Sequence, residues 1–178
     1  MVPVVSLPGT PSKAAIPIGM MRYHLVMTDT FDIRAKASFP AGALSNFAPH
    51  NFVFDDVPCA CMEGLLQSLK ISDLDEQRRI CGLTGPHAQS IGRKHDWSIS
   101  GTLWWNGKAV DRLSDEYQAL LDRAYDTLFA RSEKFRTALA ATGTTQLVHT
   151  LGKPDPCETI LTADEFCSRL MRLRERAR

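Results

Sequence analysis

The sequence lacks a strong net charge, a long hydrophobic run and any paired cysteine spacing. Its 21 Lys and Arg nearly balance 20 Asp and Glu, giving a net charge of +1 at pH 7, which disfavours a protein that coats nucleic acid by charge alone. No apolar run reaches the roughly 18 residues that a membrane helix needs, so we expect no membrane partner. The N-terminal segment also lacks the basic region and continuous apolar core of a secretory signal.

The cysteines are an odd set of five without CxxC spacing: Cys59, Cys61, Cys81, Cys157 and Cys167. This disfavours both a disulfide framework and a zinc site. His87 and His95 have no acidic or thiol partner at ligand spacing, so we expect no metal and no other cofactor. A reducing cytoplasmic location fits best. Cys59 and Cys61 are expected to be small buried hydrophobic residues.

The length and composition fit one ordinary soluble domain. The chain has 178 residues, of which 44% are hydrophobic and 23% charged, enough to bury a substantial core. Residues 1–20 contain several Pro and Gly and predict a flexible N-terminal arm. Residues 21–178 predict a single domain with no internal repeat. Its predicted class is α+β, compact and mainly helical, with a few short strands.

Periodicity and capping residues predict six helices. The clearest begins at the N-cap Ser114 and continues for about 16 residues, because its apolar side chains recur at spacings of three and four. The other helices are expected at about 60–71, 73–82, 85–95, 132–142 with Gly143 just past the end, and 162–178 with Thr162 as N-cap. Short strands are predicted at 22–27 and 50–56, a short strand or turn at 145–150, and a hairpin at 102–110 that turns at Asn106-Gly107.

The helix at 60–71 carries a polar stripe among leucines. Glu63, Gln67 and Lys70 lie on one face because steps of four and three return to the same side of a helix. Apolar side chains border this stripe on both sides, which suggests one wall of a pocket. The alternative is a solvated edge with weak pairs one turn apart.

Several blocks resemble the NADAR family, also called YbiA-like. They are "LSNFAPHNFVFDD", "CMEGLLQSLK", "RAYDTLF", "ALAATGTTQLVH" and "DPCETILT", in the family's order from about Leu44 to the terminal helix. The resemblance implies a compact α+β, mainly helical fold. It also implies an N-glycosidase that acts on N-ribosyl or N-ADP-ribosyl compounds. Some family members cleave phosphoribosylated pyrimidines of riboflavin biosynthesis, and others remove ADP-ribose from modified guanine.

The resemblance also implies site residues. The family's acidic helix residue matches Glu63, its helix lysine matches Lys70, and an aspartate after the "ATG" turn best matches Asp155 across a one-residue gap. These three are the expected reacting groups. The expected substrate contacts begin with the "SNF" loop, which is Ser45, Asn46 and Phe47, and the amide of Gln67 on the stripe. Arg93 would hold phosphate through its guanidinium, and Trp105 would stack on the base.

The chain departs from the family pattern in three places. A tryptophan that many members have ahead of the long helix is Leu113 here, and Trp97, Trp104 and Trp105 come earlier in the chain. Of these three, Trp105 on the predicted hairpin is the expected stacking ring. The usual "D-x-x-WG" is "DPCET", and the usual histidine after the helix glutamate is Gly64. These changes affect the contacts that would face the base.

The chemistry of C–N cleavage explains why such a stripe would exist. Positive charge develops at the ribose C1 while the base departs with electron density, so a carboxylate and a proton donor are needed. Glu63 and Asp155 would supply two carboxylates. Lys70 is either a Schiff-base nucleophile or the electrostatic partner of Glu63. Apolar neighbours should lower the pKa of Lys70, whereas pairing with Glu63 should raise it.

The sequence therefore predicts an N-glycosidase that frees ribose-phosphate or ADP-ribose from a nitrogenous base. The expected partner is a nucleotide-like small molecule or an ADP-ribosylated nucleic acid. A binding module that recognises ADP-ribose without cleaving it is the main alternative, because the departures affect base-facing positions. A purely structural interaction protein is the third. The oligomeric state is left open.

Overall fold

A computed structural model describes Met1 and residues 29–177 of the chain. The arm predicted for residues 1–20 and the strand predicted at 22–27 therefore lie outside the described residues, apart from Met1. The described part is an α+β domain with short strands, as predicted. Its elements in chain order are β1 (Thr30–Asp32), α1 (Ala41–Leu44), β2 (Phe52–Phe54), β3 (Val57–Cys59), α2 (Met62–Ser68), α3 (Leu74–Cys81), α4 (Gly85–Gly92), β4 (Thr102–Trp105), β5 (Lys108–Asp111), α5 (Asp115–Arg131), α6 (Glu133–Ala141), β6 (Gln146–Val148) and α7 (Ala163–Arg176).

The six predicted helices are all present in the described residues, but α2 ends at Ser68 and α4 at Gly92, short of the predicted ends at 71 and 95. The short helix α1 was not predicted. Ser114 and Ser132 accept backbone N–H bonds at the starts of α5 and α6, which satisfies donors that a helix start otherwise leaves unpaired. Thr162 and Glu165 form a reciprocal capping box at α7. Gly143 follows α6 with φ of 58°, the left-handed conformation that glycine adopts without strain. The local sequence therefore fixes these boundaries.

Two antiparallel hairpins flank helices α2 to α4 in the sequence. Strands β4 and β5 pair as predicted around Asn106-Gly107, whose φ angles are 47° and 78°. Strands β2 and β3 form a second hairpin that turns at Asp55-Asp56, with φ angles of 45° and 65°. The sequence predicted β2 and its turn residues but not β3. Both turns use positive φ at two central residues, the geometry that matches the twist of paired strands.

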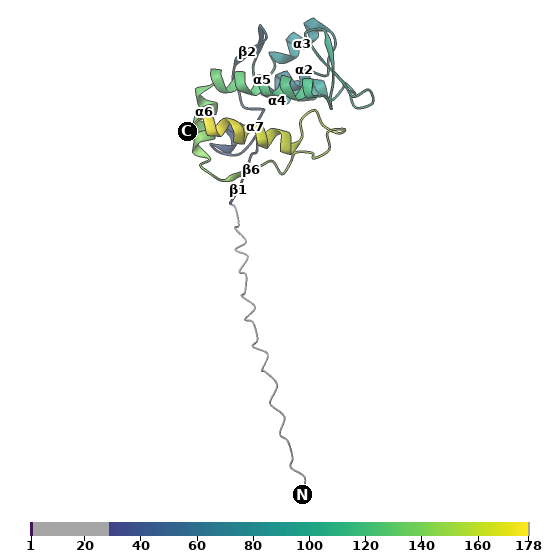
Figure 1. The fold of residues 1–178 in the computed structure, drawn as a ribbon. Helices are drawn as coiled ribbons and strands as arrows, with labels where there is room; N and C mark the ends of the chain where they lie inside the picture. The colour runs from purple at the N-terminus through teal and green to yellow at the C-terminus, as the bar shows by residue number, and fades with distance from the viewer. Residues whose placement is uncertain (2–28, 178) are drawn as a thin grey trace.

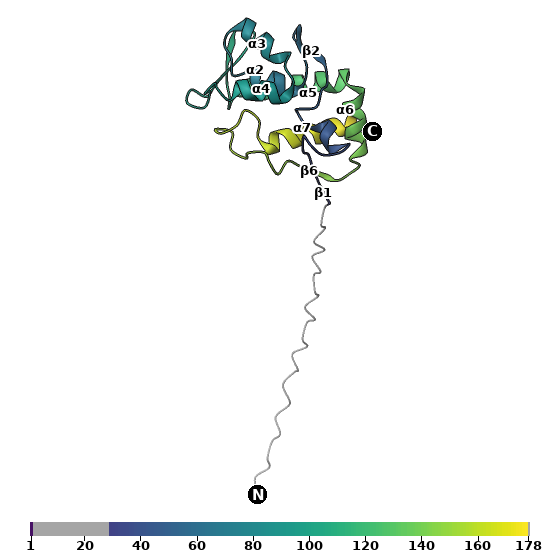
Figure 2. The same ribbon diagram turned by 180° about the vertical axis from the view of Figure 1, so that it is seen from behind.

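The third pair of strands joins distant parts of the chain. Strand β1 lies parallel to β6, with Thr30 opposite Gln146 and Asp32 opposite Val148. Figures 1 and 2 show β1, β6 and α7 together in one part of the domain, and α2, α3 and α4 together in the other. Helix α5 contacts both α2 and α7. Most buried apolar side chains belong to one continuous core that spans the two parts.

No helix among the described residues is both long and apolar enough to cross a membrane. The cysteines are all free: Cys157 is exposed, and the other four are buried. The expectation that Cys59 and Cys61 are buried small residues is confirmed.

Candidate functional site

A pocket of about 670 Å³ lies between the two parts of the domain. Its lining comes from α2, the end of α4, the segment after β1, the loop before α7, and α7 itself. Seven of the nine site residues predicted from the sequence line it: Ser45, Asn46, Phe47, Glu63, Gln67, Lys70 and Arg93. Glu63 and Gln67 of α2, and Lys70 just beyond its C-cap Leu69, therefore all line this pocket.

Glu63 is the buried acid of the pocket, with 6% of its surface exposed. It lies in the first turn of α2, where both its backbone and its side chain are hydrogen-bonded. Its backbone N–H donates to the carbonyl oxygen of Asn46 at 2.8 Å, and its Oε1 accepts from Nε2 of Gln67 at 2.8 Å. A buried carboxylate needs such a donor because burial disfavours its charged form.

Burial shifts the pKa of both ionisable groups on the stripe. Desolvation raises the pKa of Glu63 above its usual value, although the Gln67 hydrogen bond and the charges of Lys70 and Arg93 act in the opposite direction. Desolvation lowers the pKa of Lys70, and Arg93 lowers it further, while Glu63 opposes both effects. For the pKa of Lys70, the lowering by burial thus outweighs the raising by Glu63, an order that the sequence left open. Clustered groups with shifted pKa values mark candidate functional sites.

The loop carrying Ser45, Asn46 and Phe47 forms a preorganised edge. The hydroxyl of Ser45 accepts the backbone N–H of Phe47 at 3.2 Å. The side-chain oxygen of Asn46 accepts the buried hydroxyl of Tyr125 at 2.7 Å, which leaves the Asn46 NH₂ group to donate to a ligand. Phe47 packs against the start of α4, where a Cβ on Gly85 would lie 2.8 Å from the ring.

The end of α4 brings cationic groups to the pocket. Nζ of Lys70 donates to the carbonyl oxygen of Gly92 at 3.4 Å. A Cβ on Gly92 would clash with the side chain of Gln67, so the glycine permits close packing of α4 on α2. Arg93 caps α4 and is exposed at the pocket rim. An exposed guanidinium beside a pocket is suited to bind phosphate.

Two buried side chains form hydrogen bonds with backbone carbonyls of the loop before α7. Nε of Arg112 donates to the carbonyl oxygen of Thr159 at 2.9 Å, and the hydroxyl of Tyr117 donates to that of Ile160 at 2.6 Å. Arg112 also makes two hydrogen bonds to Glu165, of 3.0 and 2.7 Å. These contacts keep the loop against the domain although it has no regular secondary structure.

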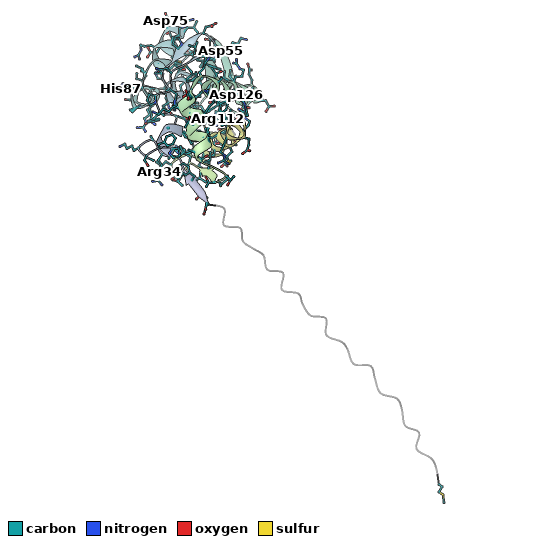
Figure 3. The ribbon with its side chains drawn as sticks, turned by 90° about the vertical axis from the view of Figure 1, so that its left-hand side faces the viewer. Arg34, Asp55, Asp75, His87, Arg112 and Asp126 are labelled. Carbon is teal, nitrogen blue, oxygen red and sulfur yellow. The ribbon has the colours of Figure 1, made fainter. Side chains whose placement is uncertain are left out.

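Two predicted site residues lie outside this pocket. Asp155 is exposed, and its carboxylate accepts the backbone N–H of Cys157 at 2.8 Å, so it does not supply a second carboxylate to the lining. Trp105 is buried against Phe54, and its indole N–H donates to Asp55 at 2.8 Å. Figure 3 shows Asp55 far from Arg34, which lies next to the pocket residues Ile33 and Ala35. Trp105 is thus a packing residue rather than the stacking ring of this pocket.

The pocket also contains residues that the sequence did not single out. His149, at the end of the quoted "TTQLVH" block, lines it together with Phe166 of α7. Lys153 and Glu158 form an ion pair of 3.3 Å in the loop before α7 and line it as well. The polar residue types were visible in the sequence, but their convergence depends on long-range contacts. Within residues 29–177, no cluster of three or more His, Cys, Asp or Glu side chains is arranged to hold a metal ion.

Comparisons with known proteins match nearly the whole described domain. The sequence model of a family described as bacteriophage protein GP30.3 matches residues 38–175. An uncharacterized 17.1 kDa protein from the Gp30-rIII intergenic region of Enterobacteria phage T4 is 37% identical over 146 residues, covering 81% of this chain and 96% of the phage protein. The solution structure of E. coli YbiA has a TM-score of 0.58 at 20% identity, covering 90% of this chain and 92% of YbiA. The last match establishes a YbiA-like fold.

Proposed function

The chain belongs to the bacteriophage protein GP30.3 family, and on that premise we propose that it is an N-glycosidase that cleaves the bond between a ribose C1 and the nitrogen of a base. The proposed substrates carry ribose-phosphate or ADP-ribose, as in ADP-ribosylated guanine or a phosphoribosyl pyrimidine of riboflavin biosynthesis. The observation that carries the proposal is the pairing of a buried acid, Glu63, with a partly buried amine, Lys70, in one pocket. The YbiA-like fold supports it.

Glu63 is the proposed carboxylate at the sugar. As the C1–N bond breaks, positive charge develops at C1, and a nearby carboxylate stabilises that charge or takes a proton from the attacking water. Burial raises the pKa of Glu63, which makes its carboxylate a stronger base near neutral pH. The hydrogen bond from Gln67 holds the carboxylate in one orientation.

Lys70 is the proposed nucleophile in a second route. Its lowered pKa increases the fraction of unprotonated amine, which is the form that attacks a ring-opened sugar to give a Schiff base. This direction favours the nucleophile role over that of a purely electrostatic partner. Arg93 and the Ser45–Phe47 loop would hold phosphate and ribose.

The proposal is tested by incubating the protein with a guanine-ADP-ribosylated single-stranded oligonucleotide and, separately, with a riboflavin-pathway phosphoribosyl pyrimidine. Release of ADP-ribose or ribose-phosphate should be lost in Glu63→Gln and in Lys70→Ala. Matched controls on the surface are Asp75→Asn, whose side chain is 96% exposed, and Lys134→Ala. Unchanged cleavage in both site variants would refute the proposed roles. No cleavage by the wild type, combined with thermal stabilisation by ADP-ribose, would identify a binding module instead.

A further inference from the structure

His149 occupies the pocket in a single defined tautomer. It follows β6 directly, and its Nδ1 lies 2.8 Å from the carbonyl oxygen of Ile33, beyond the end of the paired strand β1. A carbonyl oxygen can only accept, so Nδ1 must carry the hydrogen. The Nε2 atom is therefore the one that can exchange a proton with a ligand. None of the described residues forms a hydrogen bond with it.

The imidazole ring is held in place on two sides. Phe166 packs against it edge-on, with ring centroids 5.4 Å apart and planes at 77°. On another side, a Cβ on Gly152 would lie 2.7 Å from Cδ2 of His149, the carbon bonded to Nε2. The ring is partly exposed and lines the pocket. A locked ring with one free nitrogen in a pocket has the features of a proton-transfer group.

A continuous series of contacts connects His149 to Glu63. Phe166 contacts His149 and also Tyr125, at a centroid distance of 6.2 Å. Tyr125 donates to the side chain of Asn46, whose backbone carbonyl accepts the N–H of Glu63. His149 and Glu63 thus belong to one packed unit and line one pocket. The expected second acid, Asp155, is absent from that lining.

We propose that His149 is the general acid that protonates the departing base, a role that rests on the proposed function. The C1–N bond breaks with its electron pair moving to the base nitrogen, and the imidazolium Nε2–H transfers its proton to that nitrogen. Water adds its oxygen to C1 while Glu63 takes the water proton. Exchange of this proton through solvent then restores ionised Glu63 and protonated His149. In the Lys70 route, the same transfer accompanies departure of the base.

The decisive variant is His149→Asn, because the asparagine NH₂ group can replace Nδ1–H as donor to Ile33 while nothing replaces Nε2. Its kcat for the substrate that the wild type cleaves should fall by about 10²–10⁴-fold, the usual contribution of one general acid. Its KM and melting temperature should change little. Added imidazole should restore part of the activity.

The possible results of this experiment separate the role of His149 from the proposed glycosidase activity. If the wild type cleaves and His149→Asn has the same kcat, the role of His149 is refuted and the glycosidase remains. If activity falls together with the melting temperature and added imidazole gives no rescue, His149 is structural and the inference is again overturned. If the wild type cleaves neither substrate, the proposed function fails and the role of His149 fails with it.

Discussion

Gln67 donates a hydrogen bond of 2.8 Å to Glu63, one turn earlier on the same face of α2. This is the only side-chain hydrogen bond that Glu63 receives from a described residue. The amide oxygen of Gln67 is buried and has no partner within residues 29–177. The pair therefore combines a fixed acid with a buried amide oxygen that packs against Gly92, and its geometry predicts how Glu63 behaves when Gln67 is changed.

Replacing Gln67 with leucine should raise the pKa of Glu63 further, because the removed hydrogen bond is the largest interaction that lowers it. A catalytic carboxylate must then be ionised at higher pH, so the acid limb of the kcat/KM profile should shift toward neutrality. The free energy of unfolding near pH 7 should fall by about 1–3 kcal/mol, since a buried acceptor loses its donor. A profile with an unmoved acid limb would contradict this account. Gln89→Leu, at the pocket rim, is the matched control.

The opposite change, Glu63→Gln, should stabilise the fold while it abolishes activity. The folded pKa of Glu63 is raised above its ordinary 4.5, so the folded state binds more protons than the unfolded state once the pH exceeds that value. The stability linked to this group is therefore full below pH 4.5 and is lost as the pH rises through the folded pKa. Urea unfolding at pH 4 and pH 7.5 should show a smaller decline for Glu63→Gln than for the wild type. An equal decline in the two proteins would rule out this linkage.

The sequence predicted those parts of the molecule that depend on local chemistry. The N-caps Ser114, Ser132 and Thr162 and the turn at Asn106-Gly107 act within a few residues, so their patterns are readable directly. The stripe of Glu63, Gln67 and Lys70 was readable because helical periodicity fixes which side chains share a face. Seven pocket residues were found in this way or through the resemblance.

The missed parts depend on contacts between distant segments. His149 reaches the pocket because β6 pairs with β1, and its bond to Ile33 spans 116 residues. The course of the loop at Asp155 depends on Arg112 and Tyr117, which bind its carbonyls across 47 and 43 residues. The alternation of buried and less buried residues along β4 places Trp105 on the buried face. Alternation alone does not tell which side chains it will pack against. Such pairings are set by the whole fold.

Arg112 should therefore control both stability and the shape of the pocket. Its side chain is 1% exposed and forms two hydrogen bonds to Glu165. Arg112→Met leaves Glu165 partly uncompensated, and breaking a buried pair in this way costs about 3–5 kcal/mol. The control is Arg79→Met, whose pair with Glu76 has similar geometry but is exposed, so its loss should lower the free energy of unfolding far less. Urea unfolding measures both, and equal costs would show that the Arg112 pair has no special role.

His50 should make the fold sensitive to mild acid. It is buried between α1 and α6, donates from Nε2 to the carbonyl of Ala43 at 2.7 Å, and accepts at Nδ1 from the hydroxyl of Ser132 at 2.8 Å. In this arrangement the neutral ring has a partner at both nitrogens.

Desolvation lowers the pKa of His50 below 6.5, aided by the charge of Lys134 and opposed by the bond to Ala43. Above pH 6.5 the folded and unfolded states are both neutral at this residue, and its stabilisation is complete. Below that pH the unfolded state takes up a proton first, so stability falls as the pH drops toward the folded pKa. His50→Gln should cost about 1–3 kcal/mol at pH 7.5 but should lose less stability than the wild type between pH 7.5 and 5.5. Exposed His87→Gln should retain the wild-type decline, and a similar decline in His50→Gln would assign the acid sensitivity to another group.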